Sequence, residues 1–316
     1  MTRPTFERSI SGAFRDEIHA IILTLDEEMH IKRCIESIRD HCATITVVDS
    51  GSKDGTCEIA RAAGAEVIPN RWINYAAQMN FGIDHLVGRG GWLLRIDADE
   101  VLEPGVDIAA LLAEQPDTVS GLLVRRRIYF MGRRIRHGAI EPSWQLRLWR
   151  NGRGRCEQRW MDEHIRTDSP PLRSPIEISD KNENSLSWWT AKHNSYASRE
   201  AIDLLNAQFS FLPSTDRTTA GLGQQAQLKR RIKERIYRVL PGGLRALAYF
   251  LYRYIFRLGF LDGKPGYYFH VLQGFWYRTL VDAKVREILD YSEVQGVTLE
   301  RAIADRTGFV VRMEDH

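Results

Sequence analysis

The chain has 316 residues, of which 43% are hydrophobic and 27% are charged, and its formal net charge is +3. These proportions are those of an ordinary folded protein, and they exclude an intrinsically disordered chain. The N-terminus lacks an apolar signal-peptide region, and the longest stretch without Asp, Glu, Lys or Arg (265–277) is shorter than the ~20 residues that a membrane-spanning helix needs. We therefore expect neither a signal peptide nor a transmembrane segment.

The first hundred residues alternate between apolar strand patterns and helical patterns. Because strands that alternate with helices at this spacing form a parallel sheet covered on both faces, the sequence predicts an α/β fold. Ligands of such sheets bind beyond the carboxyl ends of the strands. The predicted strands are 18–25, 45–49, 66–68 and 92–96. One predicted helix follows Glu28 and carries Ile31, Ile35 and Ile38 on one face, and two further helices are predicted at 57–63 and 74–86.

Acidic residues follow three of these strands, namely Asp26-Glu27, Asp49 and Asp97. Each could cap the helix that follows it, and for Asp54 capping and ligand contact are equally good interpretations. For Asp49 and Asp97 a ligand is the better explanation, because neighbouring carboxylates repel one another unless a cation or donor lies between them.

Asp97 and Asp99 are two residues apart and so point the same way in an extended chain. Their oxygens suit Mg²⁺ or Mn²⁺, which one or two carboxylates can hold when phosphate oxygens of a substrate complete the coordination. The pair predicts a site for a metal ion and a diphosphate.

Four motifs occur in order over 18–103: Thr24-Leu25-Asp26-Glu27, Val47-Val48-Asp49-Ser50-Gly51-Ser52-Lys53-Asp54-Gly55-Thr56, Asn74-Tyr75-Ala76-Ala77-Gln78-Met79-Asn80-Phe81-Gly82 and Ile96-Asp97-Ala98-Asp99-Glu100. Together they resemble the inverting nucleotide-sugar transferases of glycosyltransferase family 2. The chain departs from the family at Asp26, where Asn is common.

The resemblance implies a GT-A fold, which is a Rossmann-like nucleotide-diphospho-sugar transferase domain, and a uridine-type nucleotide. The metal is expected on Asp97 and Asp99. The Asp49 carboxylate can accept hydrogen bonds from a base N–H or a ribose hydroxyl. The nucleotide-binding residues are expected to be Thr24, Leu25, Glu27, Asp49, Ser50, Asp54, Gln78, Asn80 and Asp97.

An inverting displacement also needs a base that takes the proton of the acceptor hydroxyl. By resemblance, a carboxylate that follows a strand serves as this base, and Glu163 fits that position better than Asp162; a structural salt bridge to nearby arginines is the alternative. His193 is a candidate third metal ligand, although a lone histidine is more often structural. Trp188-Trp189 could form a platform for an acceptor sugar or anchor the core.

The character of the chain changes after residue 211. Between 226 and 257 there are nine basic residues and one acidic residue, Glu234, so that this segment carries +8 and the remainder −5. An apolar face with aromatic residues follows from Leu247 to Leu258. A basic, aromatic and amphipathic segment predicts a helix in an anionic membrane interface, and a helix packed on the catalytic domain is the alternative. Nucleic-acid binding would need a recognisable reader fold, and none is found.

The expected organisation is a GT-A catalytic domain (15–212), a linker (213–223), a basic amphipathic helical membrane-associating region (224–291) and a C-terminal tail (292–316). The segment 259–284 resembles the lipopolysaccharide-core glucosyltransferase branch of the family, which implies a glycolipid acceptor. Four cysteines without metal-ligand spacing indicate reduced thiols of a cytoplasmic protein.

The expected activity is metal-dependent inverting transfer of a hexose, expected to be glucose, from a UDP-sugar to a membrane glycolipid such as lipopolysaccharide core. The protein is expected to be peripheral at the cytosolic face of the inner membrane. The alternatives are transfer to a polyprenyl phosphate, a non-catalytic sugar-nucleotide-binding scaffold of envelope assembly, and a membrane-surface adaptor that uses only the basic segment.

Overall fold

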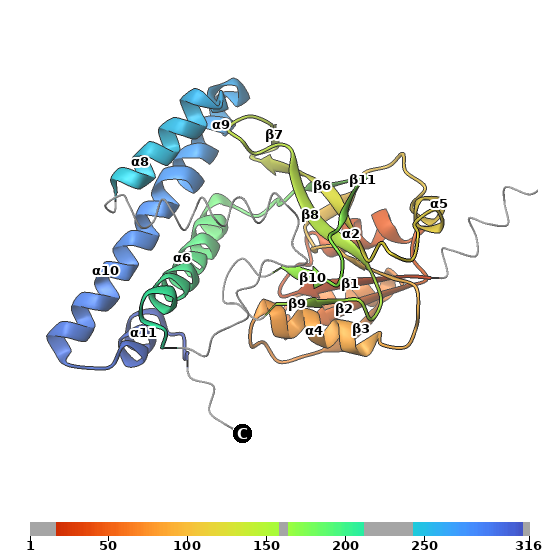
Figure 1. Ribbon diagram of the computed structural model, residues 1–316, viewed down its shortest axis with the longest axis horizontal. Helices are drawn as coiled ribbons and strands as arrows, with labels where there is room; N and C mark the ends of the chain where they lie inside the picture. Colours follow the sequence, from red (N-terminus) through yellow and green to blue (C-terminus); the bar gives the residue numbers. More distant parts are fainter. Residues whose placement is uncertain (1–16, 158–163, 212–242, 312–316) are drawn as a thin grey trace, which may run out of the picture.

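The structure, a computed structural model, describes residues 17–157, 164–211 and 243–311. It consists of a mixed sheet with helices on both faces and, beside it, a layer of helices from the C-terminal third of the chain (Figure 1). The long helix α6 (Leu186–Phe209) lies between these two parts.

The first half of the sheet is parallel and agrees with the sequence prediction. Strands β1 (Ile18–Thr24) and β2 (Thr44–Asp49) pair in parallel, and β3 (Glu66–Pro69) and β4 (Trp92–Arg95) extend the sheet on either side. These strands alternate with α2 (Ile31–Ile38), α3 (Thr56–Ala62) and α4 (Tyr75–His85). The predicted strands and helices of this half are confirmed within about two residues.

The second half of the sheet, for which the sequence analysis predicted no strand direction, is mixed. Strand β8 (Ser143–Arg150) pairs antiparallel with both β4 and β6 (Gly121–Phe130), and β11 (Leu172–Asp180) is parallel to β6 and antiparallel to β5 (Glu100–Leu102). After residue 120 the chain has short connections in place of long helical crossovers. Short connections permit antiparallel pairing, whereas parallel neighbours need a crossover. Among the described residues the strand order is β3-β2-β1-β4-β8-β6-β11-β5, with β7 (Arg133–Ile135) paired to β6.

Two hydrophobic cores cover the two faces of the sheet. Successive side chains of β1 point to opposite faces, so Ile18, Ala20 and Ile22 join the core under α2, whereas Ile21 joins the core under α4. Helix α5 (Ile108–Ala113) contributes to the first core. Outside the main sheet, β9 (Gly154–Cys156) and β10 (Ile165–Thr167) form a two-stranded ribbon next to α4.

The C-terminal helices pack on α6. Helix α10 (Tyr277–Gln295) lies against α6, and α11 (Leu299–Thr307) closes a small core with both. The preceding segment folds back on itself as α8 (Leu244–Leu251), the π-helix η1 (Tyr252–Phe256), the 3₁₀-helix η2 (Gly259–Asp262), α9 (Gly263–Phe269) and the π-helix η3 (His270–Trp276).

Part of the predicted basic segment cannot be compared with the structure. The predicted linker 213–223 and the basic residues from Lys229 to Arg238 lie outside the described residues. The apolar segment that begins at Leu244 is helical as predicted, but the chain turns at Leu258 and does not continue as a longer helix. In the described ranges no helix has the length and apolar character to cross a membrane.

Gly82 of α4 tests the packing of this helix on the sheet. A Cβ atom at Gly82 would lie 2.8 Å from Ile21 Cγ2 and 3.1 Å from Val48 Cγ2. Replacing Gly by Ala in a helix normally stabilises it by about 0.5–1 kcal/mol, but here we expect Gly82→Ala to lower the free energy of unfolding by about 1–3 kcal/mol because the added methyl overpacks the core. Urea denaturation measures the change.

The control is Gly274→Ala, since a Cβ atom there would lie 3.7 Å from its nearest neighbour outside the helix backbone, Arg253 Nη1. Its free energy of unfolding should not fall. A stabilising effect of Gly82→Ala would contradict the close approach of α4 to the sheet.

Candidate active site

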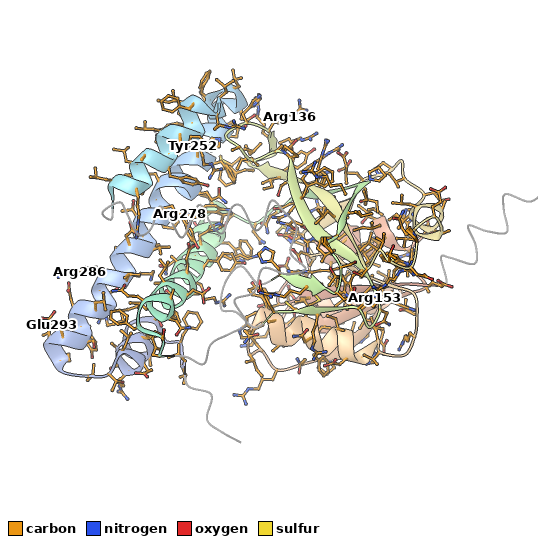
Figure 2. All side chains as sticks on the ribbon, viewed as in Figure 1. Arg136, Arg153, Tyr252, Arg278, Arg286 and Glu293 are labelled. Atoms are coloured by element: carbon orange, nitrogen blue, oxygen red, sulfur yellow. The ribbon has the colours of Figure 1, made fainter. Side chains whose placement is uncertain are left out.

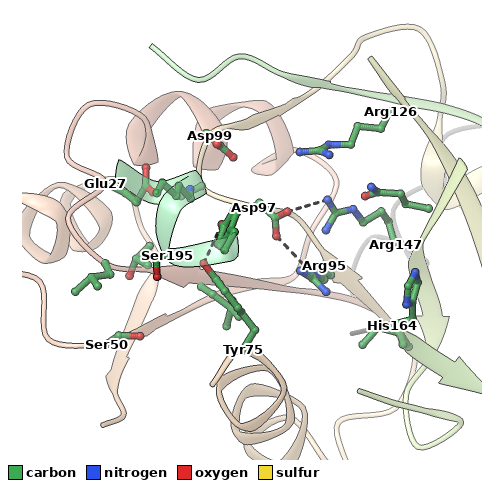
Figure 3. A pocket seen from close by; sticks show the side chains of 18 of the residues that line it. Glu27, Ser50, Tyr75, Arg95, Asp97, Asp99, Arg126, Arg147, His164 and Ser195 are labelled. Atoms are coloured by element: carbon green, nitrogen blue, oxygen red, sulfur yellow. Dashed lines mark hydrogen bonds and ion pairs between the residues drawn. The ribbon is translucent and has the colours of Figure 1, made fainter. Parts of the chain in front are cut away.

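A pocket of about 880 Å³ opens at the carboxyl ends of β1 and β4, between the sheet and α6. Its wall contains the acids Asp26, Glu27, Asp97 and Asp99 together with basic and aromatic side chains (Figure 3). This is the edge at which ligands of parallel sheets bind. The basic and aromatic lining residues are Trp72, Tyr75, Arg95, Arg126, Trp144, Arg147, His164, Trp188, Lys192, Tyr196 and Arg199.

Asp49 organises the loop that follows β2. Its side chain is buried and accepts hydrogen bonds from Thr24 Oγ1 and from the backbone N–H groups of Gly51 and Ser52, each at 2.9 Å. Burial alone would raise the pKa of Asp49, but the hydrogen bonds from Ser52, Gly51 and Thr24 lower the pKa below its usual range. The carboxylate therefore stays ionised and fixes the loop, whose neighbour Ser50 lines the pocket.

The loops after β1 and β2 are joined by reciprocal hydrogen bonds. Asp54 Oδ2 accepts from the N–H of Glu28 at 3.1 Å, and Asp26 Oδ1 accepts from the N–H of Lys53 at 2.8 Å. Asp54 also accepts from the N–H of Thr56, in the first turn of α3. Asp26 has φ 55°, a region that Asn and Asp adopt more readily than other side chains, so the Asp in place of the family's Asn keeps the backbone conformation.

An ion-pair network lies behind Asp97. Arg147 Nη2 is 2.9 Å from Asp97 Oδ2 and 2.6 Å from Glu100 Oε1, and Arg95 Nε is 3.3 Å from Asp97 Oδ1 (Figure 3). Arg126 joins the network through Glu100, at 2.8 Å, and through Asp180, at 2.7 Å. Three arginines thus face three buried or half-buried carboxylates.

The network sets the charge states of its carboxylates. Burial by itself would raise the pKa of Asp97, but Arg147 and Arg95 lower this pKa well below its usual range, so Asp97 is ionised at neutral pH. Glu100 has no exposed surface, and burial raises its pKa against the attraction of Arg147. Arg147 is itself only 3% exposed, so each charge depends on its partner to offset the cost of burial.

Asp99 is placed differently from the other acids of this cluster. Its Oδ2 accepts a hydrogen bond from Asn182 Nδ2 at 2.9 Å, and none of the described cations lies within ion-pair distance of it. Asp99 therefore adds negative charge to the pocket that the three arginines do not neutralise, and its hard oxygen donors, with those of Asp97, fit Mg²⁺ or Mn²⁺. Among the described residues no three His, Cys, Asp or Glu form a complete metal site, so ligand or water oxygens would have to supply the remaining coordination.

Helix α6 forms the opposite wall of the pocket. Lys192 Nζ lies 4.4 Å from the centroid of the Trp188 ring, and the Arg199 guanidinium lies 5.4 Å and 5.6 Å from the rings of Tyr75 and Trp72. These contacts hold two cations against aromatic faces. The wall can therefore bind an anionic ligand or stack on a planar one.

Two of the predicted nucleotide-binding residues are buried outside the pocket and form hydrogen bonds within the protein. Gln78 is fully buried and exchanges hydrogen bonds with Asn70, and Asn80 exchanges two with the backbone of Cys156. Neither lines the pocket. Direct contact of these amides with a nucleotide gains no support from their placement.

The structure describes the predicted third metal ligand, His193, but not the two candidates for the base, Asp162 and Glu163. His193 lies on α6 but does not line the pocket: its Nδ1 is 2.9 Å from the carbonyl of Trp189, and its ring stacks on that tryptophan. Burial lowers the pKa of His193 to about 4, so its ring is neutral at pH 7. Its role as a metal ligand stays a prediction. Asp162 and Glu163 lie outside the described residues, and the next residue, His164, lines the pocket.

Neither the convergence of arginines from β4, β6 and β8 nor the pocket-facing side of α6 was predicted from the sequence. Arg95, Arg126 and Arg147 come from three strands that are distant in sequence, so no local pattern brings them together. Helix α6 did carry a signal, because Lys192, Ser195, Tyr196 and Arg199 have the spacing of one helix face and all line the pocket.

Comparison with known proteins assigns the domain that carries this pocket. Residues 20–174 match the family model described as Glycosyl transferase family 2. This part of the chain is a glycosyltransferase family 2 domain. The family 2 domain contains β1 to β10 and all the acids of the pocket, whereas α6 and the C-terminal helices lie beyond it.

Curated relatives share this domain. The lipopolysaccharide core biosynthesis glycosyltransferase LpsC of Rhizobium meliloti (strain 1021) is 34% identical over 146 residues, which are 44% of this chain and 53% of that protein. The uncharacterized glycosyltransferase RT0209 of Rickettsia typhi is 40% identical over 86 residues, which are 27% of this chain and 29% of that protein. The chain thus spans about half, or less, of the length of these relatives.

Among solved structures, glucosyl-3-phosphoglycerate synthase from Mycobacterium tuberculosis in complex with Mn²⁺, UDP and glucosyl-3-phosphoglycerate is 21% identical. The similarity covers 41% of this chain and 50% of that chain, with a TM-score of 0.31. A TM-score of this size establishes neither a shared mechanism nor a shared ligand.

The ion-pair network gives a testable expectation for stability. Arg147→Met leaves buried Glu100 with one cation fewer, so the free energy of unfolding should fall by about 3–5 kcal/mol, as when one partner of a buried pair is removed. Arg155→Met is the matched control, because Arg155 also lies on a strand but its pair with Asp84 is more than half exposed. The control should change by less than about 1 kcal/mol. Equal losses in the two variants would contradict the role of Arg147.

Proposed function

We propose that this protein is a metal-dependent inverting glycosyltransferase that moves a hexose from a UDP-sugar to a membrane glycolipid. The observation that carries the proposal is the position of Asp97 and Asp99: they lie at the carboxyl end of β4 in a family 2 domain, inside a pocket large enough for a nucleotide sugar. The arginines behind Asp97 hold its carboxylate ionised and in place.

The donor nucleotide is assigned to the loops after β1 and β2. Thr24, Leu25, Glu27 and Ser50 line the pocket there, and Asp49 and Asp54 tie the two loops together from behind. A loop fixed in this way is preorganised to receive the nucleotide. The uridine specificity rests on the sequence motifs.

Asp97 and Asp99 would hold Mg²⁺ or Mn²⁺, which when bound supplies positive charge to the diphosphate leaving group. The protein's own cations add to this effect, because Lys192 and Arg199 face the pocket from α6 without an acidic partner among the described residues. Asp97 and its arginines stay paired throughout, so they need no rearrangement when charge develops.

Glu163, or Asp162, is proposed as the base that takes the proton of the acceptor hydroxyl as the hydroxyl oxygen attacks the anomeric carbon. The neighbouring residues His164 and Ile165 line the pocket, which supports this assignment. The bond from the anomeric carbon to the diphosphate breaks in the same displacement, and inversion at this carbon follows.

Lipopolysaccharide core is the proposed acceptor and glucose the proposed sugar. The Rhizobium meliloti relative is a lipopolysaccharide core biosynthesis glycosyltransferase, which supports the acceptor class. The reaction would take place at the cytosolic face of the inner membrane, where nucleotide sugars and nascent glycolipids meet.

Calorimetric titration with UDP, GDP and CDP tests the donor and the metal. We expect UDP to bind most tightly in the presence of Mn²⁺, and chelator or Asp99→Asn to weaken its binding by roughly 100-fold because the diphosphate loses its bridging cation. Asp117→Asn, which removes the charge of a fully exposed acid, is the control and should bind like the unmodified protein. Equal binding of all three nucleotides with and without Mn²⁺ would refute the proposed donor site.

Glu163→Gln tests the base. With a hydroxyl acceptor, kcat should fall by roughly 10²–10⁴-fold while UDP binding is unchanged, because the amide cannot accept the proton. Asp162→Asn is the matched variant and should retain most activity if Glu163 is the base. Full activity of both variants would favour a polyprenyl phosphate acceptor, which is already anionic, whereas loss of activity in Asp162→Asn alone would identify Asp162 as the base. UDP binding without transfer or donor hydrolysis by the unmodified protein would favour a scaffold.

A further inference from the structure

The segment from η1 to η2 exposes an unusual amount of apolar surface. Six large side chains within ten residues are between 45% and 76% exposed: Tyr252, Ile255, Phe256, Leu258, Phe260 and Leu261. We call these six residues the apolar ridge. Figure 2 shows Tyr252 on the helical layer that lies beside the sheet. Singly exposed apolar residues are common, but a contiguous set of this size marks a binding surface.

The charge around the apolar ridge has one sign. From residue 244 to residue 281 the only acid in the sequence is Asp262, which is 3% exposed. Its oxygens accept hydrogen bonds from the backbone N–H groups of Arg136 and His137 and lie 2.7 Å from His137 Nδ1. Arg257 and Lys264, in contrast, are exposed beside the ridge. This segment of the chain therefore exposes apolar and basic side chains, and its one acid is buried.

A second cavity, of about 380 Å³, adjoins the apolar ridge at Leu261. Its wall includes Arg133, Arg134 and Arg136 from β7 and the residue after it, together with His137 and the buried acid Asp262. Figure 2 shows Arg136 next to the helices that carry the ridge. Arg134 is paired with Glu141, whereas Arg133 and Arg136 are exposed and form no ion pair among the described residues. Arginine forks of this kind bind phosphate oxygens.

We propose that the apolar ridge inserts into the interface of an anionic phospholipid membrane and that Arg133 and Arg136 contact lipid phosphate groups in the adjoining cavity. Aromatic and aliphatic side chains beside exposed cations are the combination that binds such an interface. A second copy of the chain fits less well, because two basic ridges would repel one another. The described helices are too short or too polar to span the bilayer, which is consistent with a segment that lies on its surface.

Insertion of the apolar ridge would set the distance between the active site and the membrane surface. Strand β6 carries Arg126 in the pocket and ends at Phe130, directly before exposed Met131 at the tip of the β6–β7 hairpin. Five residues of extended chain separate Arg126 from Met131, which is roughly 17 Å. The pocket would thus lie just above the headgroups, within reach of the sugars of a glycolipid. Membrane binding itself does not depend on the proposed reaction.

Flotation of the full chain with vesicles tests the proposal. Vesicles of phosphatidylcholine alone are compared with vesicles that also contain phosphatidylglycerol, at low and high NaCl. We expect binding to the anionic vesicles that weakens with salt. Ile255→Ser/Phe256→Ser should reduce the partition coefficient by at least about tenfold, and Arg133→Gln/Arg136→Gln by roughly 25-fold, about fivefold for each arginine.

Matched control variants lie at the far end of the helical layer. Val294→Ser/Val310→Ser removes two apolar side chains that are 78% and 70% exposed, and Arg286→Gln/Arg301→Gln removes two exposed arginines. Both controls should bind vesicles like the unmodified protein. Because all the altered residues are exposed, the variants should unfold at the same temperature as the unmodified protein.

Three outcomes would overturn the proposal: no binding of the unmodified protein to anionic vesicles, equal losses in the test and control variants, or a dimer in solution that Ile255→Ser/Phe256→Ser converts to a monomer. The last would identify the apolar ridge as an interface between copies of the chain. UDP binding measured on the same preparations separates a failure of membrane docking from a failure of the proposed function.

Discussion

The contact of Arg147 with Asp97 and Glu100 is the interaction on which the arrangement of the active site depends. Glu100 has no exposed surface and Arg147 almost none, so their ion pair offsets part of the cost of burying both charges. Their pairing joins β8 to the turn after β4, and Arg126 extends it to β11. The antiparallel half of the sheet thereby fixes an acid pair that belongs to the parallel half.

The pocket beside this network has two kinds of wall. The loops after β1 and β2 are held by hydrogen bonds from backbone N–H groups to Asp26, Asp49 and Asp54, which makes them a rigid surface with acidic side chains. The opposite wall, on α6, presents cations on aromatic rings. A ligand that carries both a planar base and a diphosphate matches this division.

Helix α6 also couples the pocket to the rest of the molecule. One side lines the pocket, and the other packs on α10, which continues from the segment with the apolar ridge. A protein that works on a lipid-linked acceptor needs its membrane contact and its reaction centre at a fixed separation. The rigid connection through α6, α10 and β6 would provide that separation.

The sequence by itself determined the first four strands and three helices, because apolar periodicity and Gly-rich turns are local signals, and it placed Asp97 and Asp99 at a strand end. It also indicated an amphipathic segment near Leu247. The mixed second half of the sheet, the burial of Gln78 and Asn80 and the convergence of Arg95, Arg126 and Arg147 were decided only by the tertiary structure. The sheet and the arginines depend on pairing between strands whose partner residues are 17 to 58 residues apart, and no local pattern records which strands become neighbours.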